Sequence, residues 1–469
     1  MPKVLTTGRP WRVIAVFAVP LLIGNVVQQL YQVTDAFIVG RSLGVDALAA
    51  VGSTGSLLFL LLGFAWGMTS GFAIPTAQAF GAGDAVAVRR SVATGTLLTA
   101  CASLVLTVGA LLLTGPALRL LETPPELIGA ATTFATVSFA GATATMFFNY
   151  LSAIIRAIGD SRTPLVFLAL CCGFNVVLVV LLVRVAGLGV GGAAFATVVS
   201  QGISVALCLW YIKRRVPALH LSRSDFRVPR DAVTRHLRLG LPMGFQASVI
   251  AIGSLVVQLR LNELGADAVA AYTTAARVDG LAVTFLGSLG LAVSTFVAQN
   301  HGGGRPDRIR SGVSQAVVMS VVVACVLGVV LVTFGSSIVA LFVGSGEQEV
   351  VDMAAQFLTV NGLTYSALGI LFVLRGSLQG LGHALVPTLT GVTELVMRVG
   401  AAIVLGAAFG YAGIIWGNPL AWIGAAVLLV PTYLHARRRL GQPADVLVIE
   451  GPADGSYVVD AVIPTPHPA

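Results

Sequence analysis

The chain has 469 residues, of which 56% are hydrophobic and only 10% are charged, and its mean hydropathy is +0.91. A soluble protein must cover its surface with polar groups, so this composition excludes a soluble fold and indicates an integral membrane protein. The formal net charge of +8 alone would also fit nucleic-acid binding, so the placement of the basic residues decides between the two.

Apolar runs long enough for a helix to cross about 30 Å of hydrocarbon occur twelve times, which predicts an all-α integral membrane fold. We expect an N-terminal six-helix lobe over 1–212, a basic linker over 213–236 and a C-terminal six-helix lobe over 237–435. Residues 436–469 are rich in Pro, Gly and Asp and are expected to form a disordered tail. The expected spans are 13–38, 47–78, 86–114, 125–156, 163–184, 190–212, 237–259, 267–299, 308–334, 348–378, 385–408 and 411–434.

The two halves of the chain repeat one another. Residues 44–50 return as 265–271, and 78–83 return as 299–304, with the same offset of 221 residues in both places. Because each copy contains an even number of spans, the two copies share one orientation in the membrane. Long parallel repeats in a very apolar chain are typical of secondary transporters, in which two similar bundles enclose a path around a central cavity.

The basic residues lie mainly in the connections on one side of the membrane. Of the 28 lysines and arginines, only Arg41, Arg119, Arg184 and Arg260 fall in the connections on the other side. This asymmetry predicts that both termini and the linker are cytoplasmic, in a multi-pass protein of the cell (inner) membrane. It also argues against a nucleic-acid partner.

Asp35 is the most informative polar residue of the spans. It lies about 22 residues into the first span, roughly 33 Å of helix from its start, and therefore toward the outer leaflet. Asn25, Gln28, Tyr31 and Gln32 share its helical face and form a polar stripe. An ionised carboxylate in hydrocarbon is costly, so such residues usually face the bundle interior and serve function. The stripe is therefore a candidate substrate site, and the alternative that Asp35 only caps or pairs structurally stays open.

The second copy has no acid at the matching place, where the offset leads to Val256 or Val257. A titratable site is therefore expected mainly in the first lobe. Asn175 in the fifth span and Thr197 in the sixth are further polar residues, and either one alone more often makes an interhelical hydrogen bond than binds a ligand.

Four charged residues lie within spans of the second lobe. Glu394 and Arg398 are four residues apart, a spacing that permits a direct pair within one helix, which would make their role mainly structural. Arg277 and Asp279 are two residues apart, so they point to different faces, and each needs another partner or water. We list all four as secondary intramembrane charges.

Several motifs together resemble the multidrug and toxic compound extrusion (MATE) family, and its DinF-type branch most closely. The resemblance rests on 29–44, 49–52, 78–84 and 156–160, supported by 299–304 in the second copy, and it spans roughly residues 10–435. It implies two six-helix lobes in a V and export of mostly cationic, amphipathic compounds in exchange for protons or sodium ions.

The resemblance also implies roles for particular residues. Asp35 matches the first-helix acid of the DinF-type branch, Tyr31 matches a tyrosine one turn earlier, and Pro20 matches a proline that bends the helix. Asn175 and Thr197 align with two residues that complete the polar cluster around this acid and take part in cation or proton coupling.

The chain departs from the family at three acidic positions, where it has Val179, Ile250 and Leu368. These losses weaken a sodium site, which requires several hard oxygen ligands, although sodium at Asp35 stays possible. A carboxyl group withdrawn from water accepts a proton more readily. Asp35 is therefore expected to exchange an incoming proton for an outgoing cation as the lobes rock.

Two other functions are weaker. A lipid-linked oligosaccharide flippase of the same superfamily should carry several cavity arginines, and only Arg277 and Arg398 lie in the interior of spans, away from their ends. A membrane-embedded enzyme would need a metal or nucleophile motif, which the spans lack, and the five cysteines have no metal-ligand spacing. We therefore expect no enzymatic activity, no cofactor and no resident metal, and a monomer whose partners are small organic cations or drugs and the lipid bilayer.

Overall fold

The computed structural model describes residues 4–120, 124–343 and 347–441, and within these ranges the chain is helical and contains no strand. Eleven helices are long and apolar enough to cross a membrane. The bent pair α4 and α5 counts as a twelfth crossing if it forms one span. The prediction of an all-α membrane fold is therefore confirmed.

The first half of the chain, called the first lobe, contains seven helices and a π-helical turn, η1. The elements are α1 (Pro10–Leu43), α2 (Val45–Gly81), α3 (Ala85–Leu120), α4 (Pro125–Ala140), α5 (Ala142–Ala157), α6 (Arg162–Val179), η1 (Val180–Val185) and α7 (Gly189–Arg215).

The second half, called the second lobe, follows a connection with two 3₁₀ turns, η2 (Pro217–Leu219) and η3 (Arg223–Phe226). Its elements are α8 (Arg230–Leu264), α9 (Ala266–Gly302), α10 (Pro306–Val343), α11 (Gln348–Gly380), α12 (Leu385–Gly400), the π-helical turn η4 (Ala401–Leu405), α13 (Gly406–Phe409), α14 (Tyr411–Ile414) and α15 (Gly417–Arg439). Helix α15 includes the first residues of the expected tail, and the tail from residue 442 onward lies outside the described residues.

The repeat seen in the sequence is also a repeat of structure. Helices α2 and α9 each contain 37 residues, and both lobes follow the next-to-last long helix with a π-helical turn, η1 or η4. The bent pair α4 and α5 corresponds to α11, which runs as one helix. This correspondence favours counting the pair as one span, which gives twelve candidate spans in the described residues.

The bend between α4 and α5 lies at Gly141, which packs closely against α7. The two helices meet there at 45°. A Cβ atom at position 141 would lie only 2.0 Å from Cγ2 of Val198 in α7. Glycine is therefore required where α7 presses against the bend.

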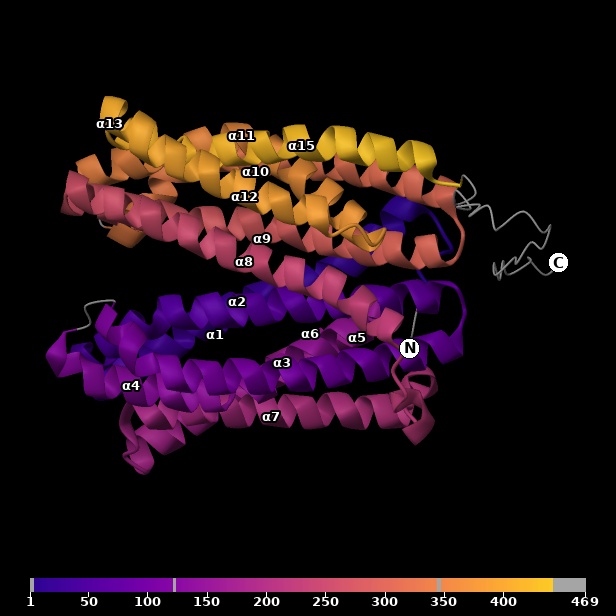
Figure 1. The fold of residues 1–469 in the computed structure, drawn as a ribbon. Coiled ribbons are helices and arrows are strands. Elements are labelled where there is room, and N and C mark those ends of the chain that lie inside the picture. Colours follow the sequence, from indigo (N-terminus) through magenta and orange to yellow (C-terminus); the bar gives the residue numbers. More distant parts are fainter. Residues whose placement is uncertain (1–3, 121–123, 344–346, 442–469) are drawn as a thin grey trace, which may run out of the picture.

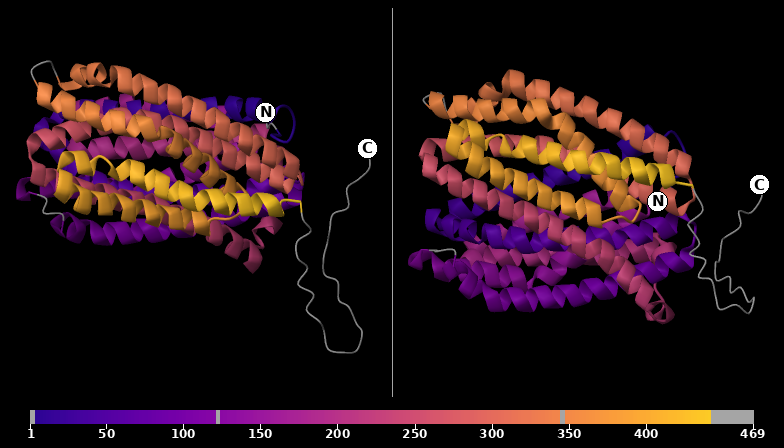
Figure 2. Two further views of the ribbon diagram at one scale, coloured as in Figure 1. Left: turned by 90° about the horizontal axis from the view of Figure 1, so that it is seen from above. Right: turned by 45° about the horizontal axis from the view of Figure 1, so that its top comes forward.

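The lobes form two layers of roughly parallel helices (Figures 1 and 2). Helices α1 and α8 connect them. Ile14, Phe17 and Leu21 in the first half of α1 belong to the core of the second lobe. Leu239 in the first half of α8 belongs to the core of the first lobe. The first helix of each lobe thus begins by packing into the core of the other lobe.

The contact between α2 and α8 is close because glycines line it. A Cβ at Gly67 would lie 2.3 Å from the carbonyl oxygen of Met243, and one at Gly71 would lie 2.7 Å from Cα of Gly240. Both contacts lie in the half of α2 nearest Gly81. The lobes therefore meet tightly toward one end of the bundle.

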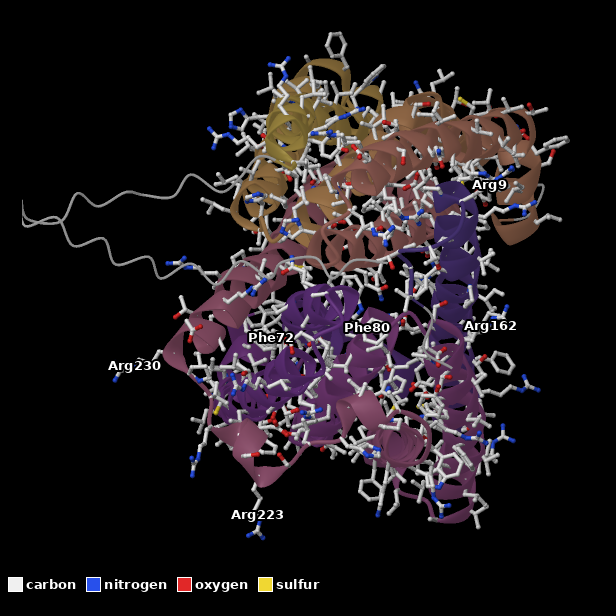
Figure 3. All side chains as sticks on the ribbon, turned by 90° about the vertical axis from the view of Figure 1, so that its right-hand side faces the viewer. Arg9, Phe72, Phe80, Arg162, Arg223 and Arg230 are labelled. Carbon is white, nitrogen blue, oxygen red and sulfur yellow. The ribbon has the colours of Figure 1, made fainter. Side chains whose placement is uncertain are left out.

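That end also gathers most of the basic residues, and we call it the basic end. It holds the start of α1, the connection between α7 and α8, and the last turn of α15 (Figures 1 and 3). Arg223 and Arg230 extend away from the helices there (Figure 3). The charges that the sequence assigned to one side of the membrane thus lie together in space.

Candidate functional site

A hydrogen-bonded cluster in the first lobe joins three of the expected site residues. The Tyr31 hydroxyl in α1 lies 3.1 Å from the Thr197 hydroxyl in α7, and Nδ2 of Asn175 in α6 donates to the same hydroxyl oxygen at 3.1 Å. Asn175 is buried and the other two are half-buried. The structure therefore brings together three helices at the residues that the sequence singled out one by one.

Asp35 lies one helical turn after Tyr31 on the same face of α1. Its side chain is half-buried, and its Oδ1 is buried without a hydrogen-bond partner. No ion pair of the described residues involves Asp35. A buried carboxylate oxygen without a donor is costly, so this position favours the binding of a proton or another cation.

A second buried acceptor without a partner lies in the same cluster, the Oδ1 of Asn175. The position that carries a further acid in the family is Val179, which is buried among apolar side chains one turn later in α6. The π-helical turn η1 begins directly after it, and such turns occur frequently at functional sites. The cluster thus contains one acid together with two hydroxyls and an amide.

The rest of the polar stripe on α1 does not join this cluster. Asn25 donates through Nδ2 to the Ser288 hydroxyl of α9 at 2.9 Å, a contact between the lobes. Gln28 and Gln32 are exposed. Pro20 is buried inside α1, which continues through it as one helix. The stripe therefore separates into a contact between lobes, two exposed amides and the Tyr31–Asp35 face.

The second lobe contains a buried acidic cluster of its own, at Asp279 of α9. Its Oδ1 accepts hydrogen bonds from Nδ2 of Asn361 at 2.9 Å and from the Tyr365 hydroxyl at 2.7 Å. The partner elsewhere that the sequence required for Asp279 is thus supplied by α11. The sequence analysis missed Asn361 and Tyr365, although their spacing of four residues places both on one face of a helix.

None of the ion pairs of the described residues joins Glu394 to Arg398, although their spacing permits one. Glu394 of α12 instead forms a buried ion pair with Arg375 of α11, and the Arg375 guanidinium also donates to the Thr390 hydroxyl at 3.2 Å. Arg398 is buried, and its Nε has no hydrogen-bond partner. Arg277, in contrast, is exposed. The neighbouring helix offers Glu394 a closer cation than its own helix does.

In the second lobe, the counterpart of Asp35 and the positions that carry acids in the family are apolar where the structure describes them. Val257 and Leu368 lie in the core of the second lobe, 1% and 2% exposed. The side chain of Ile250 lies outside the described part of the chain. The acid of the second lobe is therefore at a different place in the repeat from Asp35.

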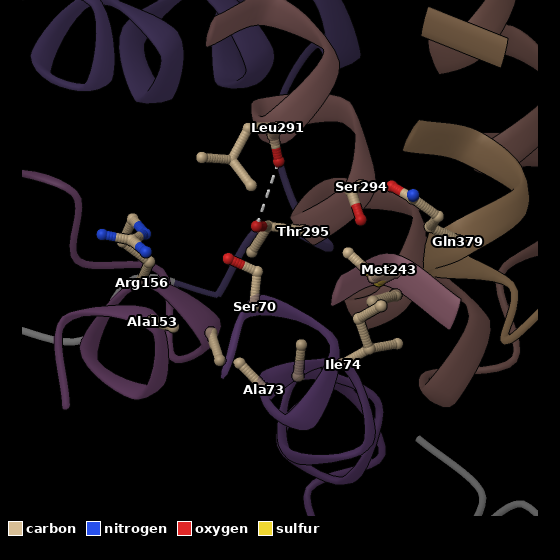
Figure 4. A pocket seen from close by; sticks show the side chains of 13 residues that line it. Ser70, Ala73, Ile74, Ala153, Arg156, Met243, Leu291, Ser294, Thr295 and Gln379 are labelled. Carbon is tan, nitrogen blue, oxygen red and sulfur yellow. Dashed lines mark hydrogen bonds between the residues drawn. The ribbon is translucent and has the colours of Figure 1, made fainter. Parts of the chain in front are cut away.

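A small cavity of about 40 Å³ lies between the lobes. Ser70 and Ala73 of α2 and Arg156 of α5 line it from the first lobe, while Thr295 and Gln379 line it from the second (Figure 4). This volume holds a water or two and is far smaller than an organic cation. The lobes are thus closed upon each other here.

A family model described as MatE matches residues 20–181 and 242–405, well over half of the chain and one segment in each lobe. The chain belongs to this family. The resemblance drawn from the sequence motifs is thereby confirmed, whereas the assignment to the DinF-type branch stays a prediction. MATE proteins are transporters and not enzymes, and they need no cofactor because ion movement drives them.

Relatives in sequence are bacterial multidrug resistance proteins. The chain is 30% identical over 389 residues to the probable multidrug resistance protein YoeA of Bacillus subtilis, covering 81% of this chain and 84% of YoeA. It is 27% identical to the probable multidrug resistance protein YpnP of the same organism, covering 92% and 96%. Against the probable multidrug resistance protein NorM of Thermotoga maritima the identity is 24%, covering 83% and 84%.

Solved structures confirm the fold. A crystal structure of a MATE protein in complex with MaL6 aligns with a TM-score of 0.87 at 22% identity, covering 94% of this chain and 99% of that one. An outward-facing multidrug resistance MATE transporter also aligns with a TM-score of 0.87 at 22% identity, covering 94% and 98%. The chain is thus a multi-pass transporter of the MATE fold, and its bacterial relatives indicate the plasma membrane.

Proposed function

We propose that this MATE protein is a proton-coupled antiporter that exports cationic, amphipathic organic compounds, with Asp35 as the group that binds proton and substrate in turn. The observation that supports this most is the buried Asp35 oxygen without a donor beside the Tyr31–Thr197–Asn175 cluster. A proton satisfies that oxygen and removes the charge that attracts a cation. Proton entry and release of the cation are then linked through one carboxyl group.

The composition of the cluster favours the proton over sodium. A sodium site in a protein is built from several oxygen ligands, preferably with more than one negative charge. Around Asp35 the candidate oxygens are two hydroxyls and the amide of Asn175, and Val179 replaces a second carboxylate. Sodium at Asp35 is the competing proposal, and an imposed sodium gradient tests it directly.

The transport cycle follows from the two-lobed fold. We propose that the basic end is cytoplasmic, in accord with the positive-inside rule, and that the protein alternates between states in which either end opens. The exposed Gln28 and Gln32 then offer amides to the cargo on the way out. A lipid-linked oligosaccharide flippase should carry several cavity arginines and fits less well. Arg375 is neutralised by Glu394 and Arg277 is exposed, which leaves Arg156 at the cavity and the buried Arg398.

The test is dye export by purified protein in proteoliposomes, driven separately by a pH gradient and by a sodium gradient. We expect the pH gradient alone to drive transport by the unmodified protein and to fail with Asp35→Asn. The matched control is Asp46→Asn, which changes an exposed acid at the start of α2 and should leave transport intact. Transport driven only by sodium would overturn proton coupling, and normal transport by Asp35→Asn would remove Asp35 from the mechanism.

A further inference from the structure

Two buried glutamines lie where the lobes meet at the basic end. Gln78 is near the end of α2 and Gln299 is near the end of α9, and the two are equivalent positions of the repeat. Their side chains are 4% and 0% exposed. A buried primary amide requires partners for its oxygen and its nitrogen, so the contacts of these residues can be followed completely.

Each glutamine donates to the backbone of the opposite lobe. Nε2 of Gln78 donates to the carbonyl oxygen of Gly380, the last residue of α11, at 2.8 Å. Nε2 of Gln299 donates to the carbonyl oxygen of Ala157, the last residue of α5, at 2.7 Å. Because α5 and α11 are equivalent in the repeat, the two bonds form a reciprocal pair, like the two halves of a twofold interface.

The amide oxygens are held by two unrelated elements. Oε1 of Gln78 accepts a hydrogen bond from the guanidinium of Arg235 in the first turns of α8. Oε1 of Gln299 accepts from the backbone N–H of Leu5, at 2.8 Å, in the segment before α1. Arg308 fixes that segment by donating to carbonyl oxygens of Leu5 and Gly8. Both amides are thus oriented toward the opposite lobe.

The backbones of α2 and α9 touch directly beside the glutamines. A Cβ at Gly81 would lie 1.9 Å from the carbonyl oxygen of Gln299, and a Cβ at Gly302 would lie 1.8 Å from the carbonyl oxygen of Gln78. These contacts are again reciprocal. Any separation of the lobes at this end therefore breaks both glutamine bonds together.

We propose that Gln78 and Gln299 form a pseudosymmetric latch that holds the basic end closed, and that the latch sets how often this end opens during transport. The proposal rests on the alternating access proposed above and assigns its closing contact to two named side chains. A net hydrogen bond of ordinary strength changes an equilibrium about fivefold. Loss of one latch bond should therefore raise the population open at the basic end about fivefold.

The test measures access to the cavity between the lobes. Ser70 lines that cavity and lies eight residues before Gln78, about 12 Å of helix deeper than the latch. In a variant without the native cysteines, Ser70→Cys provides one thiol that a membrane-impermeant maleimide reaches from the basic end only when that end opens. The native cysteines to be replaced are Cys101, Cys171, Cys172, Cys208 and Cys325.

We expect Gln78→Leu and Gln299→Leu each to accelerate labelling from the basic end about fivefold, and the double variant to accelerate it further, up to about 25-fold. The matched control is Gln246→Leu. Gln246 is also a buried glutamine that donates to a carbonyl oxygen, that of Pro387, but both residues lie within the second lobe. Labelling of either latch variant at the control rate would overturn the proposal.

A steric variant tests the same closure by an independent route. Gly81→Ala leaves both glutamines in place but introduces a methyl group where the backbones touch, so it should also accelerate labelling from the basic end. Labelling reports the conformation of the protein and not its export activity. The test therefore stays valid even if the dye is not a substrate or if the coupling ion is not the proton. Accelerated labelling by Gly81→Ala with unchanged labelling by the glutamine variants would refute the latch and leave only packing.

Discussion

The ion pair between Arg375 and Glu394 offers a sharp test of how this membrane protein tolerates charge in its core. The two side chains are 7% and 6% exposed, and they join α11 to α12. Removing one partner of a buried pair leaves the other charge without compensation, which typically costs about 3–5 kcal/mol. Glu394→Leu and Arg375→Met should therefore each lower the free energy of unfolding by about that amount.

The double variant should behave differently. Replacing both residues with apolar side chains of similar size, Arg375→Met with Glu394→Leu, removes both buried charges, and such replacements are often close to neutral. The coupling energy from the double-mutant cycle should therefore be several kcal/mol. Thr390 loses the Arg375 donor but keeps its own bond to the carbonyl oxygen of Pro387, so it adds little to the cost.

Thermal unfolding in detergent, followed by tryptophan fluorescence, measures these differences. The matched control is Glu263→Gln, which breaks the Arg260–Glu263 pair at 2.6 Å, where Glu263 is 62% exposed. Exposed pairs contribute at most about 1 kcal/mol, so this variant should leave the free energy of unfolding almost unchanged. The reasoning is refuted if the single variants of the buried pair are as mild as the control, or if their effects simply add in the double variant.

Two further predictions concern buried carboxylates with known donors. Burial acts to raise the pKa of Asp160, between α5 and α6, but hydrogen bonds from Thr163 and Tyr211 outweigh it and lower that pKa. A lowered pKa stabilises the folded protein above about pH 4, and this stabilisation is lost in acid. Asp160→Ala should therefore lower the free energy of unfolding by about 2 kcal/mol at pH 7 and by progressively less below pH 4. Unfolding measured across pH tests this. Tyr365→Phe keeps the buried ring but removes its 2.7 Å bond to Asp279, so detergent unfolding should show a loss of about 1–3 kcal/mol, and an unchanged midpoint would contradict the contact.

The sequence predicts the spans closely because membrane thickness imposes both length and hydrophobicity on each helix. The expected span 267–299 lies within α9 (Ala266–Gly302), and the expected 125–156 matches the bent pair α4 and α5. The bend itself escaped prediction. It lies at Gly141, which packs against Val198, a residue more than fifty positions away in the chain.

The contacts of the candidate site could be predicted where spacing within one helix sets them, but not where they depend on how two helices pack. Tyr31 and Asp35 share a face of α1 by spacing alone, and the family resemblance supplied Asn175 and Thr197. Glu394 shows the opposite case. The spacing to Arg398 permits a local pair, but the ion pair that forms joins Glu394 to Arg375 of α11, because a buried carboxylate takes the partner with the best geometry.

The duplicated architecture separates two requirements of an antiporter. Closing one end of two similar lobes is a symmetric task, and the contacts at the basic end are symmetric: Gln78 and Gln299 occupy equivalent positions and bond equivalent helix ends. Coupling to an ion needs only one titratable group. Asp35 in α1, whose Oδ1 is buried without a partner, and the buried Asp279 in α9 occupy positions that the repeat does not relate. The two copies therefore agree in their contacts at the basic end and differ in the placement of their acids along the helices that lead away from it.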